Sequence, residues 1–170
     1  MRWPTVYRHA MLAWLKWIVT GMGMAGALAA TPSRADITGK PLVIDGNTIE
    51  IAGERIRLHG IDAPESEQKC TAGGKEWACG QEATFALARI IETHWVTCKG
   101  NKRDRVGRLM AVCYAGPYDL NAKVVREGWA LAYRRDSMDY VDEETAARNA
   151  GRGVWRGEFM PPWEWRRSKR

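Results

Sequence analysis

The sequence predicts an α+β domain with a small β core and helical additions. Three observations predict this class: short apolar runs alternate with polar residues as strands do, turn residues separate these runs, and one longer stretch repeats its apolar residues at helical spacing. The predicted order is three strands, a helix, two strands and two further helices. Five short strands with an interposed helix are consistent with an OB-type barrel, and also with several other small barrels.

The first half of the domain predicts a strand meander and one helix. From residue 41 to residue 61 the chain alternates in strand fashion, with a turn at Asp45-Gly46. Residues 66–79 are polar and contain glycines, which predicts a loop. The stretch 81–94 then places its apolar side chains on one face of a helix.

The second half predicts a hairpin, a short strand and two helices. Residues 95–99 and 109–114 alternate as strands around a polar turn. Asp119 is a suitable N-cap for a short helix that ends at Gly128. Residues 129–133 predict a short strand, and Ser137 or Asp139 can cap a last helix that runs to about residue 150.

Residues 1–35 have the pattern of a secretory signal peptide. A positive start without acidic residues precedes an apolar stretch of small residues, and Ser33-Arg34-Ala35 provides a small-x-small cleavage signal. An uncleaved membrane anchor is the alternative, but the uncharged stretch is short and rich in glycine. We therefore expect export to the periplasm or the medium, with no stable membrane association after cleavage, followed by a linker at 36–40, a domain at 41–156 and a basic tail at 157–170 that contains Trp and Pro.

The overall charge gives little support for a nucleic-acid partner. The 170 residues carry 26 basic and 20 acidic side chains, a net charge of +6. Four of the basic residues lie in the leader, which leaves 22 basic against 20 acidic residues and a net charge of +2. Positive charge is concentrated locally in the segment 99–108 and in the tail 166–170, and a solvated surface is the simpler interpretation of the tail.

All four cysteines follow the leader, which predicts two disulfides in an oxidising compartment. Three connectivities are possible. We prefer Cys70–Cys79, which would close a glycine-containing loop, and Cys98–Cys113, which would join two segments expected to pair as strands. Zinc is disfavoured because no C-x-x-C pair is present.

Polar residues gather at two predicted turns. Asp62 and Glu65 flank Ala63-Pro64, and the proline makes this turn stiff. Two carboxylates on a rigid turn can hold a hard cation and orient a water. If the turn at Asp45, Asn47 and Thr48 meets it at one end of the barrel, an oxygen-rich cage results.

Four blocks of sequence resemble the staphylococcal nuclease-like (thermonuclease) family. They read VIDGNTIEI, RIRLHGIDAPE, DRVGRLMAVCY and KVVREGWALAY, and the similarity covers about residues 41–156. The resemblance implies a five-stranded OB-fold β-barrel with about three helices. It also implies a Ca²⁺-dependent phosphodiesterase whose substrates are single-stranded or double-stranded DNA and RNA.

The resemblance also assigns roles to individual positions. Asp62 and the backbone carbonyl of Ala63 would bind calcium, and Glu65 would position or deprotonate the attacking water. Arg57 and Arg108 would clamp the phosphate, a task for which the planar guanidinium fork is well suited. Arg105, Tyr133 and Arg135 would contact the substrate, and we expect the protein to be a monomer.

Two positions depart from the family pattern. Asn47 stands where the family usually has another calcium-binding aspartate; its amide keeps an oxygen ligand but loses a negative charge, so we expect a calcium affinity about one to three orders of magnitude lower. Val106 and Arg135 stand where tyrosines of the base pocket are expected, which predicts weaker stacking.

An alternative reading keeps the barrel without the catalysis. In that reading the chain is a weak or inactive barrel that binds nucleic acid, another polyanion or a protein at the cell surface, and Asn47 is the residue that favours it. Each site residue alone is compatible with a surface ion pair or a polar turn. We interpret His59 as structural and expect Trp163 and Trp165 to pack the tail onto the barrel, with a stacking surface as the alternative.

Overall fold

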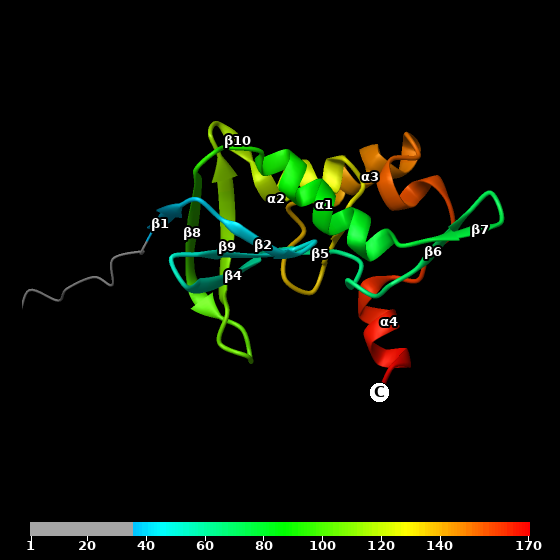
Figure 1. Ribbon diagram of the computed structural model, residues 1–170, viewed down its shortest axis with the longest axis horizontal. Helices are drawn as coiled ribbons and strands as arrows, with labels where there is room; N and C mark the ends of the chain where they lie inside the picture. Colours follow the sequence, from blue (N-terminus) through cyan, green and yellow to red (C-terminus); the bar gives the residue numbers. More distant parts are fainter. Residues whose placement is uncertain (1–35) are drawn as a thin grey trace, which may run out of the picture. The chain divides into compact units, whose positions relative to one another are not determined.

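The computed structural model describes residues 36–170, so the predicted signal peptide lies outside the described residues. The fold is α+β, as predicted: a curled sheet with helices gathered at one end (Figure 1). The main sheet has seven strands in the order β1-β8-β9-β4-β3-β2, with β10 paired to β9. Its strands are β1 (Asp36–Gly39), β2 (Leu42–Asp45), β3 (Thr48–Ile51), β4 (Glu54–Leu58), β8 (Val96–Arg103), β9 (Leu109–Ala115) and β10 (Tyr118–Asp119).

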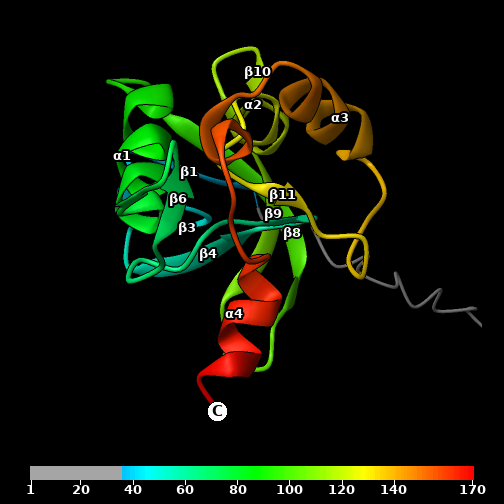
Figure 2. The ribbon, with the colours of Figure 1, turned by 90° about the vertical axis from the view of Figure 1, so that its right-hand side faces the viewer.

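The remaining elements connect this sheet to its surroundings. Two small sheets pair β5 (Ile61–Asp62) with β11 (Leu131–Ala132) and β6 (Cys70–Ala72) with β7 (Lys75–Trp77). In Figure 1 and Figure 2 the C-terminal helix stands apart from the other helices. These helices are α1 (Cys79–Ile91), α2 (Leu120–Arg126), α3 (Val141–Asn149) and α4 (Pro162–Ser168), with a 3₁₀ turn η1 (Gly153–Arg156) before α4.

The core lies between the curled sheet and the helices. Alternation along β4 buries Ile56 and Leu58 completely and turns Arg57 toward the opposite face, as the sequence predicts. Leu87 of α1 and Val124 of α2 complete the apolar contact from the helical side. Arg57 is therefore held at a strand position whose two neighbours are fixed in the core.

Local sequence signals explain most element ends. Asp119 caps α2 by accepting a hydrogen bond from the Ala122 backbone N–H at 3.0 Å. Gly128 follows that helix with a φ of 79°, a conformation that side chains disfavour. The predicted cap of α3 is wrong, because Ser137 instead accepts from the Asp139 N–H in a turn before the helix and Tyr140 is the N-cap.

Three segments differ from the sequence-based expectation. The predicted linker at 36–40 contains β1, which pairs antiparallel with β8. The predicted loop at 66–79 contains the β6–β7 hairpin. The tail at 157–170 contains α4, a helix with Pro162 in its first turn and no side-chain cap. No helix within residues 36–170 has the length and apolar character needed to span a bilayer.

The disulfides are Cys70–Cys79 and Cys98–Cys113, the preferred pairing. The first joins β6 to the start of α1, and the second joins directly paired positions of β8 and β9. Described residues include no free cysteine.

Removing either bridge is expected to lower the free energy of unfolding by about 2–3 kcal/mol, because each closes a short loop in the unfolded chain. The measurement is urea unfolding of Cys70→Ala/Cys79→Ala and Cys98→Ala/Cys113→Ala beside the parent protein. Unchanged unfolding midpoints in both variants would contradict the assignment of the bridges as stabilising cross-links.

Candidate functional site

Two turns meet at one end of the sheet and build the site. A Cβ atom at Gly46 would lie 2.7 Å from the Ala63 Cβ and 3.1 Å from that of Ala83, so the turn after β2 packs directly onto the turn after β5 and onto α1. This confirms the expected meeting of the Asp45–Thr48 and Asp62–Glu65 segments. The absence of a side chain at Gly46 allows this approach.

Asp62 is the centre of the site. Its side chain is fully buried, and four hydrogen bonds from three residues satisfy its carboxylate. Oδ1 accepts from Arg57 Nη2 at 3.0 Å, from Asn47 Nδ2 at 3.2 Å and from Arg166 Nη1 at 3.1 Å. Oδ2 accepts from Arg166 Nη2 at 2.7 Å. Such saturation is what a buried carboxylate requires in a medium of low dielectric.

Arg166 bridges the two carboxylates of the site. Besides its two bonds to Asp62, its Nη1 donates to Glu65 Oε1 at 2.6 Å. Partial burial of the guanidinium opposes its protonation, but the hydrogen bonds to Asp62 and Glu65 outweigh this and raise the pKa of Arg166 above its ordinary value. Arg166 therefore carries a permanent positive charge into the site from α4.

Asn47 acts as a donor in this arrangement. The backbone N–H of Asn47 bonds the Asp45 carboxylate at 2.9 Å, which fixes the turn, and the buried side chain directs its amide nitrogen at Asp62. A carboxylate at position 47 would instead place two negative groups about 3 Å apart and would require a cation between them. The amide satisfies Asp62 without one.

Arg108 is oriented by Asp104, a residue that the sequence analysis did not single out. The Asp104 carboxylate accepts from Arg108 Nε at 2.7 Å and from the backbone N–H groups of Val106 and Arg108. Burial opposes ionisation of Asp104, but these hydrogen bonds outweigh it and hold the pKa of its carboxyl below the ordinary value. The sequence signal that could have predicted this role of Asp104 is the D-x-V-x-R spacing, which is typical of an Asx turn.

Gln68 ties the Glu65 turn to the C-terminal segment. Its fully buried side chain accepts from the Glu65 N–H at 3.2 Å and donates to the Met160 carbonyl at 2.6 Å. Gly80 packs so closely that a Cβ there would lie 1.7 Å from the Glu65 carbonyl oxygen. Glu65 is therefore placed by α1 and by the chain that leads into α4.

The predicted site residues share one cavity of about 640 Å³. Asp62 and Ala63 lie buried behind this cavity. His59 lines a different surface near Lys99 and does not reach the site. The cavity lining includes Asn47, Arg57, Glu65, Arg105, Arg108, Tyr133 and Arg135, together with Arg166, which the sequence analysis placed in a solvated tail.

The donors at this site are those that hard cations prefer. Asp62, Glu65, the Asn47 amide and the Ala63 carbonyl offer only oxygen once the amide turns its oxygen inward. Among residues 36–170, no three His, Cys, Asp or Glu side chains cluster in a way that could hold a metal ion. Besides the carboxylates of Asp62 and Glu65, a cation here would need amide, carbonyl or water oxygens as further ligands.

The sequence that carries this site matches a known family. The family model of staphylococcal nuclease homologues matches residues 55–157, which carry Arg57, Asp62, Glu65 and Arg108. The chain belongs to the staphylococcal nuclease family. This membership accounts for the pairing of a curled sheet with a polar site at one end, and it supports hydrolysis of phosphodiester bonds.

Individual relatives include proteins named as nucleases and one named for succinoglycan biosynthesis. The chain is 37% identical over 126 residues to the succinoglycan biosynthesis protein ExoI of Rhizobium meliloti (strain 1021). This alignment covers 72% of this chain and 66% of ExoI. The chain is 35% identical over 144 residues to an uncharacterized endonuclease of Escherichia coli O157:H7, covering 79% and 88% of the two chains. It is 32% identical over 163 residues to a micrococcal nuclease of Shigella flexneri, covering 84% and 88%.

Replacing Asp104 by Asn is expected to lower the free energy of unfolding by about 1 kcal/mol at pH 7, because the charge opposite Arg108 is lost. The folded-state pKa of Asp104 is depressed, so its contribution is present above the ordinary value of 3.8 and is lost as the pH falls through the folded-state pKa. Urea unfolding between pH 2 and pH 7 measures this. Asp139→Asn, at an exposed position, is the matched control; equal effects of both variants at pH 7 would contradict the role of Asp104.

Proposed function

We propose that the chain is an exported, calcium-dependent nuclease that hydrolyses phosphodiester bonds of DNA or RNA. The observation that carries this proposal is the convergence of Arg57, Glu65 and Arg108 on one cavity behind which Asp62 is buried. Relatives named nuclease and endonuclease support it. Export is supported by the two disulfides, which suit an oxidising compartment.

The two arginines suit the charge of the reaction. A phosphodiester is anionic and gains negative charge on its equatorial oxygens during in-line displacement. Arg57 lies in β4 and Arg108 directly precedes β9, and these two strands pair in parallel at this point. Arg57 is held by Asp62 and Arg108 by Asp104, so both guanidinium groups are oriented before substrate binds.

Glu65 provides the base of the proposed reaction. One of its carboxylate oxygens accepts from Arg166, and its side chain lines the cavity in which the phosphate and the attacking water would lie. The attacking water gives its proton to Glu65 as the new P–O bond forms. The departing oxygen takes a proton from solvent as the old P–O bond breaks.

Calcium would be held by Asp62, the Asn47 side-chain oxygen and the Ala63 carbonyl. When bound, it supplies Lewis-acid polarisation of a phosphate oxygen. Its entry requires Arg166 to leave Asp62 and the Asn47 amide to turn, since both now direct N–H groups at the carboxylate. These two requirements support a weaker calcium affinity than a site with a carboxylate at position 47 would have.

Cleavage of single-stranded DNA by residues 36–170 tests the proposal directly. The parent is expected to cut at millimolar calcium, and Asn47→Asp to lower the half-saturating calcium concentration at least about tenfold, because the restored charge attracts the ion. Glu65→Gln is expected to lower the rate by about 10²-fold or more. Glu67→Gln, the same change at an exposed position two residues away, is expected to have no effect.

A second candidate is a barrel that binds nucleic acid, another polyanion or a protein partner without cutting. The saturation of Asp62 by Asn47, Arg57 and Arg166 favours it, because the site is electrostatically satisfied as it stands. One outcome would contradict the nuclease proposal and support this one. The parent protein would bind the strand, and neither the parent nor its Asn47→Asp variant would cleave it at any calcium concentration.

A further inference from the structure

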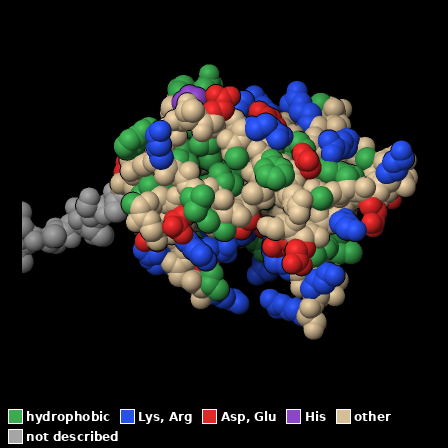
Figure 3. All heavy atoms as spheres, viewed as in Figure 1, with side chains coloured by type: hydrophobic (Ala, Val, Ile, Leu, Met, Phe, Trp, Pro, Cys, Tyr) green, Lys and Arg blue, Asp and Glu red, His purple; other side chains and the backbone are tan. Residues whose placement is uncertain are grey.

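Helix α4 lies beyond the residues that match the nuclease family, yet it forms one side of the site region. The family match ends at residue 157, and α4 begins at Pro162. Figure 3 shows Lys and Arg side chains on both sides of a notch between the β8–β9 turn and α4. The tail is therefore part of a basic cleft.

A cavity of about 520 Å³ opens between α4 and residues 132–135. It adjoins the larger cavity that Arg57, Glu65 and Arg108 line. Both cavities share four lining residues: Arg105, Tyr133, Arg135 and Arg166. Its volume lies within the range of small-molecule sites. A strand whose phosphate lies between Arg57 and Arg108 can thus continue directly into it.

The lining of this second cavity is one-sided in charge. Six arginines and no acidic side chain line it. Two of them are neutralised, Arg134 by Glu144 and Arg166 by the catalytic-site carboxylates. The other four form no ion pair with any residue of 36–170: Arg105, Arg135, Arg167 and Arg170. Such a concentration of like charge favours an anionic occupant.

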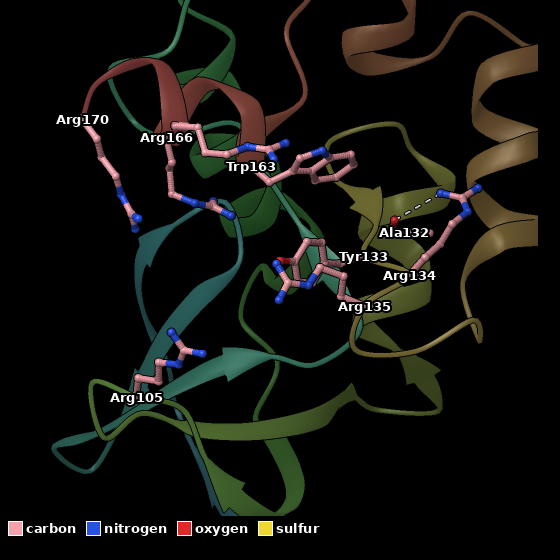
Figure 4. Close-up of a pocket in the computed structure, with 9 residues that line it drawn as sticks. Arg105, Ala132, Tyr133, Arg134, Arg135, Trp163, Arg166 and Arg170 are labelled. Atoms are coloured by element: carbon pink, nitrogen blue, oxygen red, sulfur yellow. Dashed lines mark hydrogen bonds between the residues drawn. The ribbon is translucent and has the colours of Figure 1, made fainter.

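An aromatic pair lines the same cavity. The rings of Tyr133 and Trp163 lie 5.7 Å apart between centroids at an angle of 42°. Figure 4 shows Trp163 directed toward Tyr133, while Arg170 reaches in from the end of the chain after α4 and Arg105 from the β8–β9 turn. Aromatic faces beside a row of guanidinium groups are the elements that bind single strands, by stacking on bases and pairing with phosphates.

We propose that α4 provides a second subsite, which holds the nucleotides that flank the cleaved phosphodiester of a single strand. Trp163 and Tyr133 contact a base, and Arg167 and Arg170 pair with backbone phosphates. This proposal rests on the proposed function, which places the cleaved bond beside Arg57 and Arg108. It replaces the base contact that Val106 and Arg135 do not supply, because neither side chain is aromatic.

Binding of short oligothymidylates tests the subsite separately from cleavage. Fluorescein-labelled strands of two and eight nucleotides are titrated, with anisotropy as the readout, into residues 36–170 carrying Glu65→Gln. Arg167→Ala/Arg170→Ala is expected to weaken binding of the eight-nucleotide strand about 10- to 30-fold and to leave the two-nucleotide strand within about threefold. The slope of log K against log salt concentration is expected to fall by about 1.4.

Two controls sharpen the result. Arg89→Ala/Arg126→Ala removes two exposed charges from α1 and α2, away from both cavities, and is expected to change binding less than about threefold. Trp163→Leu is expected to weaken binding of the eight-nucleotide strand at least about fivefold through lost stacking.

Equal losses of affinity in the two double-arginine variants would overturn the subsite. Binding of a heparin fragment with the same arginine dependence and tighter than the strand would overturn the nucleic-acid assignment.

Cleavage separates the two proposals. A parent that cuts both a dinucleotide and a long strand, while Arg167→Ala/Arg170→Ala leaves the KM for both unchanged, would overturn the subsite and leave the nuclease standing. A parent that cuts neither, yet binds the long strand with the predicted dependence on Arg167 and Arg170, would overturn the nuclease and support the binding surface on α4.

Discussion

The buried carboxylate of Asp62 is the constraint on which the site depends. Removing an ionised carboxylate from water costs several kcal/mol unless partners compensate, and here Arg57, Asn47 and Arg166 do so. Those partners come from a strand, a turn and the C-terminal helix, which lie far apart in the sequence. Satisfying one charge therefore fixes the relative positions of β4, the β2–β3 turn and α4.

The same constraint connects folding to the proposed chemistry. A guanidinium and an amide neutralise Asp62 in the structure, whereas the proposed reaction exchanges them for a cation. The site is thus stable before metal binds, because every oxygen of Asp62 has a donor. In the proposed reaction Arg166 would stabilise the site before metal binds and would oppose metal entry. Helix α4 carries Arg166, Arg167 and Trp163, and it would link that competition to the wall of the proposed substrate cleft.

Local signals explain what could be predicted from the sequence. The alternation at Ile56 and Leu58, the Asp119 cap and the Cys98–Cys113 bridge each depend on neighbours in one element or one hairpin. The family resemblance then placed Arg57 and Glu65 in one site. Arg166 could not be found this way, because its partner Asp62 lies 104 residues away and α4 is a short helix without a side-chain cap. Strand β1 was missed for the same reason, since its pairing with β8 is long-range.

Calcium binding by residues 36–170, measured by isothermal titration calorimetry with and without Arg166→Ala, tests the central claim most directly. If the guanidinium competes for Asp62, its removal tightens calcium binding about tenfold. Arg167→Ala, one residue further along α4 and without an ion pair to any residue of 36–170, is expected to leave calcium binding unchanged. Equal or weaker binding by Arg166→Ala would contradict the account, because Arg166 would then support the site without competing for its carboxylates.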